Sequence, residues 1–213
     1  MDRANSSKVK AVILDYGEVL CYSPTVEEWA RMASVFGIDP RAFRKLWNRN
    51  RLLYDRGDLS PGAYWSAVAE DAGTQLAPEQ LPLLRQWDVE MWAHENPIMV
   101  EWLKQIHSFG IRTGLLSNMP HDMIRHVRQK FAWLECFDHQ TFSAEVQLIK
   151  PDAAIYEHSL RGVGAEASEA LFADDKEPNV KGARAVGMHA VQFRSLEQFG
   201  NDLDKLGFTI LPA

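Results

Sequence analysis

Cysteine is scarce in this sequence, because only Cys21 and Cys136 occur among its 213 residues. That is too few for the disulfide framework that stabilises small secreted domains. Each cysteine stands beside an apolar residue, so we expect buried, reduced thiols and a cytoplasmic protein. The segment 1–8 also lacks the apolar stretch of a secretory signal, which supports the same location.

Long apolar runs and runs of basic residues are missing as well. No run approaches the roughly 20 apolar residues of a membrane-spanning helix, so we expect no membrane partner. The 23 basic and 29 acidic side chains give a net charge of −6, which disfavours nucleic acid as a partner. No histidine or cysteine spacing is typical of a zinc site, and there is no glycine-rich nucleotide loop.

The sequence does contain an alternation of strand-like and helical segments. At this length it can form one large domain, or a domain with a small insert. Helical patterns accompany the apolar runs, and this alternation is typical of an α/β fold with a parallel sheet covered on both faces. The runs that predict strands are 9–14, 111–116, about 137–142, 170–173 and 188–193.

The segment between the first two predicted strands shows no convincing strand. Ser23-Pro24, Asp39-Pro40 and Ser60-Pro61 each place a helix-capping residue before a proline that suits a first helical turn. Apolar residues recur at helical spacing in four places, which predicts four helices. We therefore predict a core domain of residues 1–20 and 96–213 and a helical insert of residues 21–95.

Polar residues follow several of these apolar runs, and Asp15 is the first. A carboxylate can attack phosphorus and form an aspartyl-phosphate, which divides a difficult hydrolysis into two steps; the alternative is an aspartate that caps a turn. Ser117 ends the second run. Its hydroxyl and the N–H groups of the turn can bind a phosphoryl oxygen. It can also cap the next helix, and the two roles are compatible.

Lys150 and the pair Asp174-Asp175 complete this set. A lysine held before Pro151 can offset the charge of a carboxylate beside a phosphate, unless it is an ordinary surface lysine. Two adjacent carboxylates repel each other unless a cation is near, and Mg²⁺ is the cation we expect. The alternative is a polar loop with Asn179 as its turn residue. Since carboxyl ends of parallel strands share one edge, all these groups should meet there.

Four motifs that contain these residues follow one another in the chain in the order typical of the haloacid dehalogenase superfamily of hydrolases. The chain resembles this superfamily over nearly its whole length. Within it, the chain is most similar to glucose-1-phosphatase-like proteins and to the N-terminal phosphatase domain of soluble epoxide hydrolase. The resemblance implies a Rossmann-like sheet, with the insert as a helical cap. The motifs are VILDYGEVL, GLLSNMP, LIKPDAAIYEHSL and LFADDKEPNVKGARAVGMHAVQF.

The resemblance also implies roles for single residues. Asp15 is the expected nucleophile, and Ser117, Asn118 and Lys150 are expected to bind or neutralise the phosphoryl group. Asn118 and Asn179 are further expected to orient their neighbours.

The same resemblance implies a Mg²⁺ site. Its expected ligands are Asp15, the backbone carbonyl of Gly17 and Asp175. Asp174 is expected to support the metal from behind these ligands or through water.

Gly17 departs from the pattern of phosphatases in this superfamily, which carry a second aspartate there as general acid. Losing a general acid commonly costs about 10²–10⁴-fold in rate. Three accounts are open: esters with good leaving groups, a proton from another residue such as Glu18 or from water, or vestigial activity. The glucose-1-phosphatase-like branch has a glycine at this point too, which favours the first account.

The leading prediction is a Mg²⁺-dependent phosphomonoesterase that acts through an aspartyl-phosphate on Asp15. Its expected substrate is a small phosphorylated metabolite, above all a sugar phosphate such as an aldose 1-phosphate. One alternative is a 2-haloacid dehalogenase, although Asp174 and Asp175 would repel its carboxylate substrate. The other is a catalytically weak binding or regulatory protein. We expect a monomer or a homodimer.

The insert contains candidates for contact with the organic part of the substrate. By polarity and position they are Arg49, Arg51, Tyr54 and Asp55. Six of the seven tryptophans fall in or near the insert and the helix after it. We expect most of them in the core, with one or two shaping a pocket.

Overall fold

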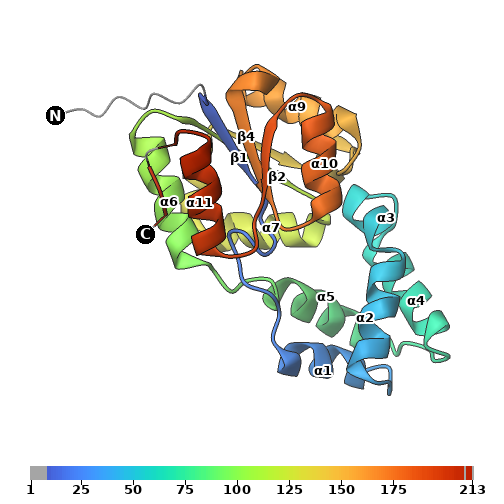
Figure 1. Ribbon diagram of the computed structural model, residues 1–213. Helices are drawn as coiled ribbons and strands as arrows, with labels where there is room; N and C mark the ends of the chain where they lie inside the picture. The colour runs from blue at the N-terminus through green and yellow to red at the C-terminus, as the bar shows by residue number, and fades with distance from the viewer. Residues whose placement is uncertain (1–8, 209, 213) are drawn as a thin grey trace.

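A five-stranded parallel sheet forms the centre of the molecule (Figure 1). The computed structural model describes residues 9–208 and 210–212, so the segment 1–8 lies outside the described residues. The strand order is β3-β2-β1-β4-β5, which confirms the predicted α/β fold. The strands are β1 (Ala11–Leu14), β2 (Arg112–Ser117), β3 (His139–Phe142), β4 (Ala170–Asp174) and β5 (His189–Gln192).

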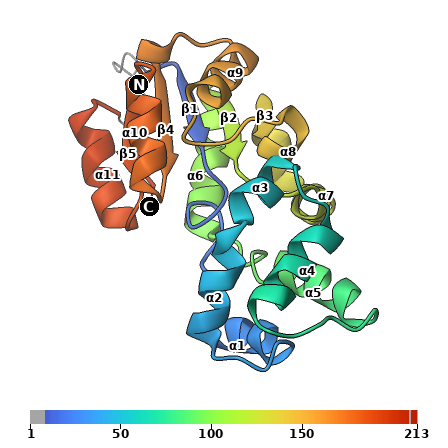
Figure 2. The same ribbon diagram turned by 90° about the vertical axis from the view of Figure 1, so that its right-hand side faces the viewer.

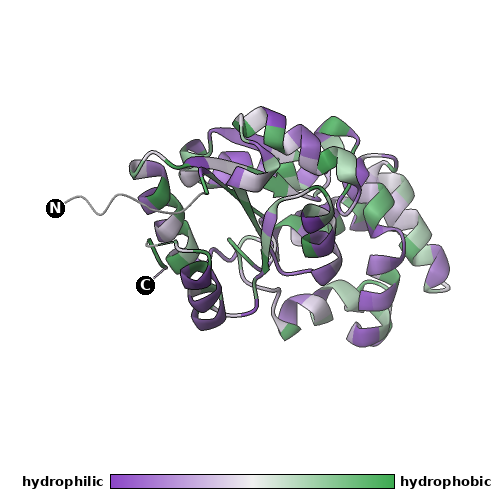
Figure 3. Cartoon of the chain, turned by 45° about the horizontal axis from the view of Figure 1, so that its top comes forward, coloured by the Kyte–Doolittle hydropathy of each residue, from purple (hydrophilic) through white to green (hydrophobic). Residues whose placement is uncertain are grey.

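Helices cover both faces of this sheet, as predicted. On one face lie α6 (Pro97–Ser108), α7 (His121–Lys130) and α11 (Leu196–Lys205). On the other lie α9 (Ala153–Val163) and α10 (Glu177–Ala185). Shorter elements are α8 (Ser143–Val146) and two 3₁₀ helices, Ala132–Cys136 and Ala167–Glu169. Figure 3 shows hydrophobic residues on the central strands, while both kinds alternate along the surrounding helices.

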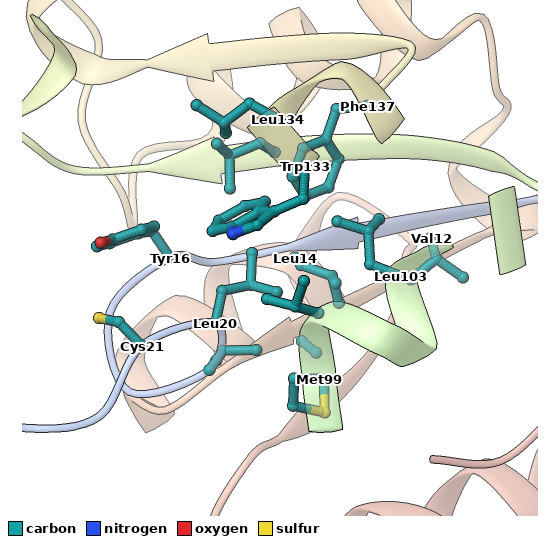
Figure 4. Packing of buried hydrophobic residues seen from close by; sticks show 14 of the residues in the cluster. Val12, Leu14, Tyr16, Leu20, Cys21, Met99, Leu103, Trp133, Leu134 and Phe137 are labelled. Carbon is teal, nitrogen blue, oxygen red and sulfur yellow. The ribbon is translucent and has the colours of Figure 1, made fainter. Parts of the chain in front are cut away.

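Strand β1 is buried on both faces because its side chains alternate between two apolar clusters. Val12 and Leu14 enter the cluster under α6, where Figure 4 shows them near Leu103. Ala11 and Ile13 enter the cluster under α9 and α10. The end of β1 is therefore held firmly between two packed layers.

Five helices, one more than predicted, lie between β1 and α6 in the described chain: α1 (Val26–Ser34), α2 (Pro40–Arg49), α3 (Arg51–Arg56), α4 (Pro61–Asp71) and α5 (Gln80–Glu90). The extra one is α3. Its apolar residues are consecutive, so they give no helical spacing. Asp39 and Ser60 cap α2 and α4 as predicted. The prediction at Ser23-Pro24 was wrong, because Thr25 caps α1 while the Ser23 hydroxyl donates to Glu18.

The helical insert has an apolar core of its own, drawn from residues 29–91. Its entry and exit segments lie side by side. Cys21 and Glu95 form an antiparallel bridge, and the N–H of Asn96 donates to the carbonyl of Leu20 at 2.9 Å. Both observations support the predicted division at residues 21–95, which we keep as a proposal. Figure 2 shows α3 beside α8, where the insert rests on the sheet domain.

Two further expectations concern the state of the cysteines and membrane-spanning helices. Both cysteines are free; Cys21 is buried as expected, whereas Cys136 is half-buried. Among the described residues, no helix combines the length and the apolar character that crossing a bilayer requires.

Candidate active site

Most of the predicted site residues line a cavity of about 410 Å³ at the carboxyl ends of β1, β2 and β4, whereas Asp174 and Asp175 lie beside Asp15 without lining it. The core supplies its floor, and α2 and α3 of the insert supply part of its wall. Polar residues that line the floor are Asp15, Ser117, Asn118, Lys150 and Asn179. This convergence follows from the parallel sheet, whose strands all end at the same edge.

Asp15 is the first residue after β1 and is 5% exposed. Its N–H donates to the carbonyl of Ala173 at 2.9 Å, which extends the pairing of β1 with β4 by one residue. Its Oδ1 lies 2.9 Å from Nζ of Lys150 but accepts no well-directed hydrogen bond from a described residue. The carboxylate is thus oriented by its backbone and by its ion pair with Lys150.

Lys150 is fixed on three sides and is only 1% exposed, so the surface-lysine alternative was wrong. Its Nζ donates to the carbonyl of Leu116 at 2.9 Å and to Oδ2 of Asp174 at 2.6 Å, and it faces Asp15. Burial disfavours the ammonium, but the carboxylates of Asp15 and Asp174 prevail and raise the pKa of Lys150. The residue is therefore a fixed positive charge at the floor of the cavity.

Asn118 holds the backbone of this lysine. Its Oδ1 accepts from the N–H of Lys150 at 2.9 Å, and its Nδ2 donates to the carbonyl of Lys150 at 3.0 Å. Since the amide is engaged in this way, its geometry is that of a residue that positions Lys150. The predicted contact of Asn118 with phosphate stays a prediction.

Asp174 is fully buried and surrounded by donors. Its oxygens accept from Lys150, from the N–H of Lys176 at 2.8 Å, and from Nδ2 of Asn179 at 2.9 and 3.0 Å. Asn179 is thus the orienting neighbour that the resemblance implied. With both oxygens occupied, Asp174 is better placed to support a metal site than to be its main ligand.

Asp175 completes a group of carboxylates with Asp15 and Asp174, whose oxygens lie within 4.8 Å of one another. Burial and the charge of Asp15 raise the pKa of Asp175 to about 7. One ammonium, that of Lys150, against three carboxylates leaves a formal charge of −2. Such a surplus of negative charge fits a divalent cation.

Ser117 ends β2 and is 3% exposed, with its side chain at the cavity. The alternative role as a helix cap was wrong, because α7 begins after Pro120 and has no side-chain cap. Among the described residues its hydroxyl has no hydrogen-bond partner, so it is available to a ligand.

Gly17 lines the cavity. Steric crowding does not explain why a glycine stands here. A Cβ built there would meet only Cζ3 of Trp92, at an ordinary contact distance of 3.9 Å. Neighbouring Glu18 does not line the cavity in the described chain, and its Oε1 accepts from the Ser23 hydroxyl at 2.7 Å. The structure therefore gives Glu18 no support as a proton donor.

The wall of the cavity is largely apolar, and most of its residues were not singled out from the sequence. They are Trp47, Leu52, Trp92, Met119 and Met123. The expectation that one or two tryptophans shape a pocket matches Trp47 and Trp92, whose rings stack with centroids 6.3 Å apart. The sequence offered no further signal, because apolar residues that line a cavity and those that fill a core look alike.

Of the four polar candidates in the insert, only Arg51 and Asp55 line the cavity. Arg49 instead pairs with Asp71, and Tyr54 stacks on Tyr64.

Arg51 lies between two carboxylates. Its Nε donates to Asp55 at 2.7 Å, and its Nη1 donates to both oxygens of Asp88 at 2.9 and 3.0 Å. Its guanidinium also stacks on Trp47, at 4.2 Å from the ring centroid.

Two relatives with assigned activities are similar over most of the chain. A sesquiterpene phosphatase of Aspergillus oryzae is 27% identical over 84% of this chain and 87% of its own length. An (S)-2-haloacid dehalogenase of a Pseudomonas species is 24% identical over 89% of this chain and 86% of its own. The chain spans only 36%, 13% and 39% of three further relatives that it matches.

Solved structures show the same fold. A haloacid dehalogenase family enzyme of Bacteroides thetaiotaomicron, solved with magnesium and inorganic phosphate, aligns with a TM-score of 0.71. It is 18% identical, and the alignment covers 87% of this chain and 94% of that one. The family model for haloacid dehalogenase-like hydrolases matches residues 9–187. Sequence, sheet order and the groups around Lys150 agree with that match, and the chain belongs to the haloacid dehalogenase-like hydrolases.

Proposed function

We propose that this hydrolase is a Mg²⁺-dependent phosphomonoesterase that uses Asp15 as its nucleophile. The observation that carries the proposal is the floor of the cavity. There a buried ammonium faces Asp15, a free hydroxyl lies nearby, and three carboxylates carry surplus negative charge. This set matches the needs of phosphoryl transfer, which depends on positioning and on positive charge around the phosphoryl oxygens.

In the proposed reaction, an oxygen of Asp15 attacks phosphorus while the bond from phosphorus to the alcohol oxygen breaks. The hydroxyl of Ser117 and the ammonium of Lys150 hold the phosphoryl oxygens. Water then attacks phosphorus, which releases inorganic phosphate and restores the carboxylate. Asp15, the carbonyl of Gly17 and Asp175 would hold Mg²⁺, with Asp174 behind them. The bound ion would supply further positive charge to the phosphoryl oxygens.

For the organic part of the substrate we propose an apolar alcohol. The wall presents two stacked tryptophans, two methionines and a leucine. Arg51 is already paired with carboxylates, so its guanidinium is not free for sugar hydroxyls. The similarity to a sesquiterpene phosphatase supports the same substrate class. The sugar phosphate predicted from the sequence stays a prediction that the same experiment tests.

A 2-haloacid dehalogenase is the second candidate, and a relative with that activity favours it. Against it stands the crowding of Asp15, Asp174 and Asp175, which would repel a carboxylate substrate. The branch within the family, the cytoplasmic location and the state as monomer or homodimer stay predictions. So does the third alternative, a catalytically weak binding protein.

Phosphate release from a panel of esters tests the proposal. The panel contains hexyl and farnesyl phosphate, an aldose 1-phosphate and an aldose 6-phosphate, each with Mg²⁺ or with a chelator. We expect release that needs both Mg²⁺ and Asp15, is abolished in Asp15→Asn, and is fastest with the apolar esters. Asp204→Asn, an exposed aspartate on α11, is the matched control. Halide release from 2-chloropropionate without phosphate release would overturn the proposal.

A further inference from the structure

The alcohol that leaves phosphorus must gain a proton, and Gly17 supplies none. The titratable side chains that line the cavity are Asp15, Tyr16, Arg51, Asp55, Lys150 and Lys176. Asp15 is the proposed nucleophile, and the ammonium of Lys150 is committed to its three partners. The hydroxyl of Tyr16 already donates to the carbonyl of Trp92 at 2.7 Å, and burial raises the pKa of Tyr16. Of the remaining three, Arg51 and Asp55 lie on α3 of the insert, and Lys176 is exposed.

Asp55 has one oxygen bound and one oxygen free. Its Oδ1 accepts from Nε of Arg51 at 2.7 Å, which fixes the carboxyl group on α3. Its Oδ2 accepts no hydrogen bond from any described residue, and it is not among the buried atoms without a partner. Because Asp55 lines the cavity and is 6% exposed, Oδ2 is the carboxyl oxygen that is left for a ligand there.

Asp55 also sits where the insert touches the loops of the sheet domain. The hydroxyl of Ser143 donates to the backbone carbonyl of Asp55 and accepts from the N–H of Met119 at 2.9 Å. Met119 lies two residues after Ser117 in the chain. One serine hydroxyl thus connects Asp55 to the loop that carries a phosphate-binding candidate.

We propose that Asp55 takes the place of the acid that Gly17 lacks, an assignment that rests on the proposed phosphatase function. The carboxyl group of Asp55 gives its proton to the alcohol oxygen as the bond to phosphorus breaks. The resulting carboxylate then takes a proton from the water that attacks the aspartyl-phosphate, and the carboxyl group is restored.

The surroundings of Asp55 suit both steps. Burial raises the pKa of Asp55 to about 6; Arg51 and Lys176 act to lower it, and Asp88 acts to raise it. A group with a pKa near the working pH can both give and take a proton. Lys176 also lines the cavity, but it is exposed, and an ammonium cannot accept a proton from water.

The test compares two esters in the variant Asp55→Asn. p-Nitrophenyl phosphate has a leaving group that needs no proton, whereas hexyl phosphate has one that does. We expect kcat/KM for hexyl phosphate to fall about 10²-fold or more, while kcat/KM for p-nitrophenyl phosphate changes by less than about threefold. In the wild type, kcat/KM for hexyl phosphate divided by kcat/KM for p-nitrophenyl phosphate should fall as pH rises above 6. This fall should vanish in Asp55→Asn.

Two further variants control the result. Asp58→Asn, a partly exposed aspartate three residues away, should leave both esters unaffected. Gly17→Asp, where a Cβ would meet no clash, should restore hexyl phosphate turnover in the Asp55→Asn background. An equal loss with both esters, or no loss with either, would overturn the assignment.

A measurement independent of turnover separates this assignment from the proposed function. A wild type that releases no phosphate from either ester would count against the phosphatase. The carboxyl carbon of Asp55 can still be titrated by NMR, with the Asp55→Asn spectrum for assignment. A midpoint near 6 supports the proposal, and a midpoint near 4, the ordinary value of an aspartate, would contradict it.

Discussion

Two cations of this molecule, Lys150 and Arg51, have the same surroundings of buried charge. Each faces two carboxylates, Asp15 and Asp174 for the lysine and Asp55 and Asp88 for the arginine. Each group therefore carries surplus negative charge in a place with little water. Around Lys150 a metal ion would remove the surplus, and around Arg51 protonation of Asp55 would do so below about pH 6.

The surplus negative charge around Arg51 leads to a prediction about folding stability at different pH. The pKa of Asp55 is raised from 3.8 to about 6 on folding, so its ionised form disfavours the folded state. Folding stability is therefore lost as pH rises from about 4 to above 6, by up to roughly 3 kcal/mol. Urea unfolding of the wild type and Asp55→Asn between pH 4 and 8 should show that the variant loses less stability. Parallel curves for the two proteins would contradict the prediction.

The residues on the floor of the site could be predicted from the sequence because each directly follows an apolar run. Asp15, Ser117 and the pair Asp174-Asp175 stand at ends of strands that a parallel sheet must bring together. Asp55 could be named only as one polar position among several. Its importance depends on which oxygen Arg51 occupies, and no pattern in the sequence encodes that contact.

Helix α10 lies close to the turn after Lys150, at Gly182. A Cβ built at Gly182 would lie 2.6 Å from the carbonyl oxygen of Pro151 and 2.9 Å from Oη of Tyr156. Pro151 follows Lys150, so the glycine lets α10 pack directly against the turn that carries the buried ammonium.

We therefore expect Gly182→Ala to displace this turn. Overpacking of this kind commonly costs about 1–3 kcal/mol, and kcat should fall because Lys150 moves. Gly200→Ala in α11 is the control, since a Cβ there meets nothing within 4 Å. That variant should be neutral or stabilised by up to about 1 kcal/mol, as alanine favours a helix over glycine. Thermal unfolding and kcat of both variants measure the effect; equal behaviour would contradict it.

Capping residues followed by proline predicted two of three helix starts. The starts of α2 and α4 were visible in this way, whereas the same signal at Ser23-Pro24 lay two residues before the true cap of α1, Thr25. Helix α3 has six residues and follows α2 after Asn50 alone, so it lacked both a cap and an apolar period. Its existence depends on packing against α8, which is a contact distant in sequence.

On the scale of the whole molecule, the contact between α3 of the insert and α8 of the sheet domain brings the two parts of the cavity lining together. Gly57 ends α3 with a left-handed φ of 87°, and a Cβ there would lie 3.3 Å from the carbonyl oxygen of Ala144. In the same region the hydroxyl of Ser143 donates to the carbonyl of Asp55 and accepts from the N–H of Met119.

Gly57→Ala should therefore push the insert away from the sheet domain. Gly73→Ala, at a φ of 74° but with nothing within 4 Å, pays a similar backbone strain of about 1 kcal/mol without the clash. We expect Gly57→Ala to lose more activity with hexyl phosphate than Gly73→Ala at matched stability. Steady-state kinetics beside thermal unfolding provide the comparison, and identical kinetics of the two variants would count against the inferred contact.

The isolated bridge between Cys21 and Glu95 has a consequence for how such a protein can change. Since Leu20 and Asn96 are hydrogen-bonded at 2.9 Å, whatever chain connects them begins and ends at one point of the sheet domain. The length of this segment could therefore vary while its two ends stay anchored beside β1 and α6. Because α3 carries Asp55, exchange of the segment would alter the proposed proton donor as well as the wall of the cavity.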